Sequence, residues 1–199
     1  MALATYADLQ TQIANWIARA DLTSYIPDFI TLFETQANRR LRVRLMETSA
    51  TLTPSGGFVA LPSDYLMWRY LKWAGSTARV LEYVHPSYFL ASYPTWPSDV
   101  PRYFTITSGY ISIIPQDTGP LTFGYFQKIP ALSLGTNWLI TAYPDVYLFG
   151  ALAEAYGFMK DPDNMAIWQS RRDQGFDEIE KLDQKTRGPA QVQVIGWTP

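Results

Sequence analysis

The last third of the chain constrains the fold most, because two long helical patterns follow each other there with only a tight corner between them. They span residues 144–160 and 162–183. Each begins with a proline, which suits the first turn of a helix because the N–H that proline lacks would have no partner there. Asp161, just before the second proline, is placed to cap the free amides of the following helix.

The apolar residues in both patterns recur at helical spacing. In the first helix an apolar face is formed by Phe149, Leu152, Ala153 and Tyr156. Small residues make the rest of this helix nearly apolar, so we expect it to be covered on more than one side. In the second helix one apolar stripe, opposite a charged back, is formed by Met165, Trp168, Phe176, Ile179 and Leu182.

Two amphipathic helices are also expected at the start of the chain. Thr5-Tyr-Ala-Asp8 has the spacing of a capping box and opens a helix that ends near Asp21. A second helix of about five turns begins at Ile26-Pro27. Its apolar residues step by four, at Phe29, Phe33, Ala37, Leu41 and Leu45. The two terminal helical pairs together predict a four-helix cluster.

The middle of the chain has β character. Short strands are expected at residues 50–53, 58–61, 66–74, 79–84, 102–107, 110–114 and 121–127. Pro54-Ser-Gly-Gly57 predicts a hairpin between the first two, and His85-Pro86 begins a short helix or turn. The sequence therefore predicts an α+β fold with a small antiparallel sandwich or open barrel inserted into the helical cluster. The expected divisions are a helical domain (1–47 and 137–185), a β module (48–136) and an extended C-terminal arm (186–199).

The amino-acid composition argues against an enzymatic or metal-binding function. The chain has 199 residues, no cysteine, a single histidine and a formal net charge of −2. These features leave no multi-histidine or cysteine-based metal site and no thiol nucleophile, and no phosphate-binding glycine motif is present. Asp161 and Asp163 read as cap and turn residues because further oxygen ligands are lacking. We therefore expect no catalysis, no cofactor and no metal, in a soluble protein without a membrane helix or signal peptide.

Two features remain open to a functional interpretation. Arg39, Arg40, Arg42 and Arg44 gather at one helix end. They form either a solvated face that complements the helix dipole or a patch facing DNA in a channel or a neighbouring subunit. Aromatic residues in irregular or terminal segments are either interface anchors or carbohydrate-stacking platforms: Trp96, Tyr103 and Trp197.

Several segments, taken in order, resemble the head-to-tail adaptor proteins of tailed bacteriophages and of phage-like gene transfer particles. These segments are Thr5-Tyr-Ala-Asp-Leu9 with Trp16 and Asp21-Leu22, Ile26-Pro-Asp-Phe-Ile30, Asn38-Arg-Arg-Leu-Arg42 with Met46-Glu47, Leu61-Pro-Ser-Asp-Tyr65, Tyr125-Phe-Gln-Lys-Ile-Pro-Ala-Leu132, Asn137-Trp-Leu-Ile140, Tyr143-Pro-Asp-Val-Tyr-Leu-Phe-Gly150 and Ala153-Glu-Ala155. The resemblance runs from about residue 5 to residue 182.

The resemblance implies a structural protein of the virion neck, assembled in the cytoplasm of the bacterial host. Such adaptors form a ring, usually of twelve subunits, beneath the portal; the ring extends the channel for double-stranded DNA and carries the stopper or tail proteins. C-terminal arms often dock into the portal, and the expected docking residues here are Val192, Val194, Ile195 and Trp197. The alternative is a carbohydrate- or receptor-binding tail component that uses exposed aromatic residues.

Overall fold

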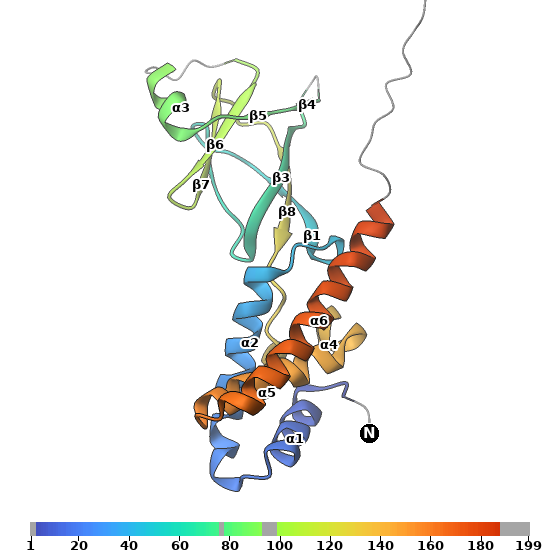
Figure 1. The fold of residues 1–199 in the computed structure, drawn as a ribbon. Helices are drawn as coiled ribbons and strands as arrows, with labels where there is room; N and C mark the ends of the chain where they lie inside the picture. The colour runs from blue at the N-terminus through green and yellow to red at the C-terminus, as the bar shows by residue number, and fades with distance from the viewer. Residues whose placement is uncertain (1–2, 76–77, 93–98, 188–199) are drawn as a thin grey trace, which may run out of the picture. The chain divides into compact units, whose positions relative to one another are not determined.

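The computed structural model describes residues 3–75, 78–92 and 99–187. The chain divides into a helical unit, Met1–Leu45 with Ile129–Pro199, and a β unit, Met46–Lys128 (Figure 1). The predicted α+β fold class is confirmed. The predicted boundaries lay slightly later in the chain, after residues 47 and 136. Most of the predicted arm, residues 188–199, lies outside the described residues.

In the described part of the helical unit the chain forms five helices. They are α1 (Tyr6–Ile17), α2 (Ile26–Arg40), α4 (Trp138–Ala142), α5 (Pro144–Phe158) and α6 (Pro162–Arg187). A 3-10 turn at Ala20–Tyr25 joins α1 to α2, and further 3-10 turns follow α2 at Arg44–Met46 and precede α4 at Leu132–Leu134. As predicted from its apolar composition, α5 is covered on several sides: it contacts α1, α2, α4 and α6. Gly150 allows α2 to approach, since a Cβ there would lie 1.9 Å from the Phe33 ring.

The predicted helix starts are confirmed. The Asp8 amide donates to Thr5 Oγ1 at 3.1 Å and the Thr5 amide to Asp8 Oδ2 at 3.2 Å, so the capping box of α1 is complete. At the corner before α6, Asp161 Oδ1 accepts a hydrogen bond from the Asn164 amide at 3.2 Å. No helix in the described ranges is long and apolar enough to cross a membrane.

The second predicted helix is shorter than expected, because α2 ends at Arg40 instead of reaching Leu45. Leu41 is already extended, and from there alternate residues, Leu41 and Val43, are buried while Leu45 is 55% exposed. Leu41 and Val43 can fill the core from an extended segment as well as from a helix, because the burial period is then two instead of four. The step-by-four pattern therefore overestimated the length of this helix.

Among its described residues, the β unit is a sandwich of two four-stranded sheets. Its strands are β1 (Glu47–Leu52), β2 (Phe58–Ala60), β3 (Tyr65–Trp73), β4 (Arg79–Val80), β5 (Glu82–Tyr83), β6 (Tyr103–Thr107), β7 (Tyr110–Ile114) and β8 (Leu121–Gln127), and α3 (Pro86–Ser92) follows β5. The sheet orders are β1-β8-β3-β4 and β2-β7-β6-β5. Residues of both sheets, such as Leu71 and Phe123 in one and Phe104 and Ile111 in the other, form one core.

One predicted strand pairing is wrong, and one predicted strand is divided between the two sheets. The segment 50–53 belongs to β1, which pairs with β8, whereas β2 joins the other sheet and pairs with β7. The chain does turn where expected, as Ser55 and Phe58 exchange backbone hydrogen bonds of 2.8 and 3.1 Å, but the two strands then diverge. The predicted strand 79–84 also divides: β4 pairs with β3, while β5 pairs with β6 in parallel. The turn residues therefore predict where the chain bends. Which strand pairs with which depends instead on the side chains that each strand buries in the core of the sandwich.

Candidate functional site

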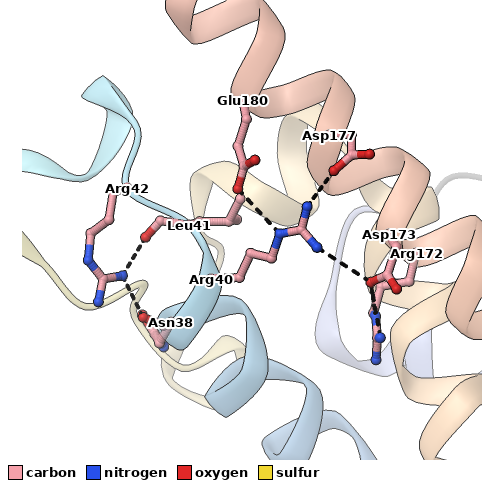
Figure 2. A network of polar contacts seen from close by, with 8 residues as sticks. All are labelled: Asn38, Arg40, Leu41, Arg42, Arg172, Asp173, Asp177 and Glu180. Carbon is pink, nitrogen blue, oxygen red and sulfur yellow. Dashed lines mark hydrogen bonds and ion pairs between the residues drawn. The ribbon is translucent and has the colours of Figure 1, made fainter.

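The arginine-rich end of α2 meets an acidic face of α6, with Arg40 at the centre (Figure 2). Its guanidinium lies against Asp177, 3.4 Å from Glu180 Oε1 and 4.0 Å from Asp173 Oδ1. These three acidic residues follow each other at intervals of four and three, so they share one face of the helix. The Arg40 guanidinium also lies 5.7 Å from the centre of the Phe176 ring.

Arg44 is likewise paired with α6. Its backbone amide donates to Asp183 Oδ1 at 2.9 Å, and its Nε lies 3.4 Å from the same oxygen. The Asp183 side chain is only 10% exposed. A carboxylate that is this far buried needs hydrogen-bond partners, and Arg44 provides them. The contact fastens the segment after α2 to the last turns of α6.

Arg42 and Arg39 take different directions. In Figure 2, Arg42 points away from the acidic face, and its Nη1 donates to the carbonyl oxygens of Asn38 at 2.7 Å and Leu41 at 2.5 Å. It thereby satisfies carbonyls that the end of α2 leaves without helical partners. Arg39 is exposed and has no hydrogen-bond or ion-pair partner among residues 3–75, 78–92 and 99–187. The four arginines therefore do not form one continuous cationic patch.

The polar contacts continue along α2 toward α5. Arg172 of α6 donates to Gln36 Oε1 at 2.6 Å, and Gln36 Nε2 donates to Glu154 Oε1 of α5 at 2.6 Å. Sequence reasoning missed this link, although Gln36 and Arg40 are four residues apart and thus share a face of α2. Through these hydrogen bonds, polar side chains of α2, α5 and α6 form one network that holds the three helices together.

A buried polar cluster, also missed, lies on the other side of α2. Glu34 Oε1 accepts hydrogen bonds from the Leu132 amide at 2.7 Å and from the Tyr147 hydroxyl at 3.1 Å, and Asn137 Nδ2 donates to that hydroxyl oxygen at 2.7 Å. Burial raises the pKa of Glu34. Burial and the nearby Glu34 charge raise the pKa of Tyr147. The sequence did contain one signal for this cluster, because Glu34 is a polar residue at a core position of the α2 pattern.

The other sequence-based candidates do not converge on a site. Val192, Val194, Ile195 and Trp197 lie outside the described residues, as does Trp96. Tyr103 is half-buried in β6. His85 Nδ1 lies 2.6 Å from Ser87 Oγ at the start of α3. Within the described residues, no three His, Asp or Glu side chains are grouped closely enough to hold a metal ion.

The polar side chains described above are arranged to hold helices together, as in a structural building block. The family model described as SU10 adaptor protein matches residues 4–194. Because this match covers nearly the whole sequence, the chain belongs to the SU10 adaptor protein family and is a structural adaptor of phage particles, which interacts with other head and tail proteins. The resemblance to phage head-to-tail adaptors is thus confirmed at the level of the family. A search of curated proteins found no match.

Proposed function

We propose that this chain forms a ring beneath the portal at the capsid vertex, extends the channel for DNA and presents a platform for stopper or tail proteins. The observation that carries this proposal is the family match, which runs through both units, from residue 4 to residue 194. The ring has twelve subunits and lies in the neck of the virion. The protein acts by assembly alone, without catalysis or a cofactor.

The charge of the chain suits a passive channel. With a formal net charge of −2, the surface as a whole does not attract the phosphate backbone. The proposed channel lets double-stranded DNA pass without sequence-specific binding. The contacts of Arg40, Arg42 and Arg44 favour a role in holding the subunit together. Arg39, whose charge has no partner among the described residues, is the arginine that we propose faces the channel or a neighbouring subunit.

The C-terminal residues are proposed to attach the ring to the portal. Residues 188–199 continue directly from the end of α6, and they include Val192, Val194, Ile195 and Trp197. Burying one such side chain contributes about 1.5–3 kcal/mol. A ring repeats the contact around the vertex, so that individually weak arms hold together through multivalency.

Binding to the portal tests the proposal. The full chain should co-sediment with assembled portal protein at micromolar concentration, and deletion of residues 188–199 should weaken this binding at least tenfold while the helical circular dichroism is retained. Unchanged binding by the truncated chain would refute the docking arm. Failure of the full chain to bind the portal, together with saturable binding to a glycan array, would instead support a carbohydrate-binding tail component.

A further inference from the structure

A leucine knob projects from the helical unit at the 3-10 turn Leu132–Leu134. Leu132 is buried, and its amide is held by Glu34 at 2.7 Å. Leu134, at the other end of the turn, is 87% exposed, more than any other large apolar side chain that the structure describes. A single exposed leucine is ordinary. The turn that carries this one, however, is held in place by the hydrogen bond between the Leu132 amide and Glu34.

An apolar hollow lies elsewhere on the same unit, between the segment after α2 and the last turns of α6. Its volume is about 150 Å³, and its apolar lining is formed by Val43, Leu45, Tyr143, Ile179 and Leu182. Leu45 is 55% exposed and Leu182 50% exposed. The hollow is about as large as the cavity of ~150 Å³ that truncation of a core leucine to alanine can leave in a protein. One leucine side chain therefore matches its size.

The electrostatics of the knob and the hollow also match. The charged residues at the rim of the hollow, Arg44 and Asp183, are paired with each other at 3.4 Å. The segment that carries the knob, residues 129–142, contains no charged residue. An uncharged side chain can therefore enter without leaving a charge unpaired, whereas burying a charged side chain there would cost free energy of desolvation.

We propose that Leu134 of one subunit inserts into this hollow on a second copy of the chain, and that this contact joins neighbours in the ring. The inference rests on the ring of the proposed function. Because the knob and the hollow are different surfaces, the contact is heterologous, and repeating it produces a closed ring when the rotation allows closure. A standard interface buries about 800 Å² on each partner, so the leucine is an anchor within a larger contact.

Complementation between two variants tests this contact. Leu134→Asp removes the knob and Leu182→Asp spoils the hollow; both side chains are at least half exposed, so the fold should be retained. Each variant alone should self-associate at least tenfold more weakly than the unmodified chain, in analytical ultracentrifugation with and without portal protein. Mixed together, they should form a dimer and nothing larger, because only one intact knob and one intact hollow meet. Leu32→Asp, at a leucine of α2 that is as exposed as Leu182, should assemble normally.

The other outcomes separate this inference from the proposed function. If the unmodified chain forms rings and both variants do so as well, the leucine contact is wrong and the adaptor ring stands. If the unmodified chain forms no ring even with portal protein, the proposed function itself fails. If Leu182→Asp reproduces the effect of deleting residues 188–199 while Leu134→Asp assembles normally, the hollow receives the C-terminal segment instead, which overturns the inference.

Discussion

At the scale of single residues, the helical unit depends on polar side chains that are buried with partners. Glu34, 9% exposed, accepts hydrogen bonds from the Leu132 amide and the Tyr147 hydroxyl. Satisfied buried groups of this kind stabilise a unique arrangement, while an unpaired one costs about 1–3 kcal/mol. Through these bonds, one carboxyl group on α2 fixes the turn that carries Leu134.

Glu34 should make the stability of the helical unit depend on pH. Burial raises its pKa above the ordinary 4.5, so the folded state holds the proton more tightly than the unfolded state. Its contribution to stability is therefore full below pH 4.5 and is lost as the pH rises through the raised pKa of the folded state. Glu34→Gln keeps the accepting oxygen without the charge. Relative to the unmodified chain, this variant should gain in free energy of unfolding as the pH rises to neutrality.

Chemical denaturation followed by helical circular dichroism at a series of pH values measures this difference. Glu34→Ala is the matched comparison, since it leaves the Leu132 amide and the Tyr147 hydroxyl without their acceptor and should lose about 1–3 kcal/mol at every pH. A difference between Glu34→Gln and the unmodified chain that stays constant with pH would show that Glu34 does not titrate as described.

At the scale of elements, α2 and α6 are tied by charge at their ends. Arg40 faces three acidic residues of α6 whose side chains are 34% to 50% exposed, and the Arg40 side chain itself is 38% exposed. Pairs as exposed as these contribute little individually, about 0–1 kcal/mol. Their common partner matters more, because without Arg40 the acidic residues of one helix face repel each other.

Arg40→Ala should therefore lower the free energy of unfolding of the helical unit by about 1 kcal/mol at low salt. The loss should shrink as the ionic strength rises, since the Debye length falls from about 10 Å at 0.1 M to about 3 Å at 1 M. Arg39→Ala removes the same side chain one position earlier, where it is exposed and has no partner among the described residues. It should change stability by less than about 0.5 kcal/mol. Equal effects of the two substitutions would contradict the assigned role of Arg40.

The elements also show what could be predicted from the sequence. Helix starts were predictable because caps are local: Thr5 with Asp8, and Asp161 with Asn164, are each three residues apart. Strand partners were not, since β1 pairs with β8 across most of the β unit. The same limit applies to the site. The arginine cluster was visible in the sequence, but its partner Asp177 lies 137 positions from Arg40.

At the scale of the whole molecule, the chain is a phage adaptor built of a helical unit and a β unit, each with its own core. Family membership could be inferred from scattered motifs because they follow in order along nearly the whole sequence. The surfaces through which we propose that the adaptor assembles could not be inferred in this way. The knob at Leu134 and the hollow beside Leu182 are created by the fold, from segments that no local pattern connects.

The proposed ring is the central claim, and electron microscopy of the purified chain bound to portal protein tests it most directly. Class averages viewed along the channel axis should show a second ring, of twelve subunits, continuing the portal on the side that faces the tail. Averages of the portal alone, or subunits attached singly around its outer wall with the channel no longer than before, would contradict the claim.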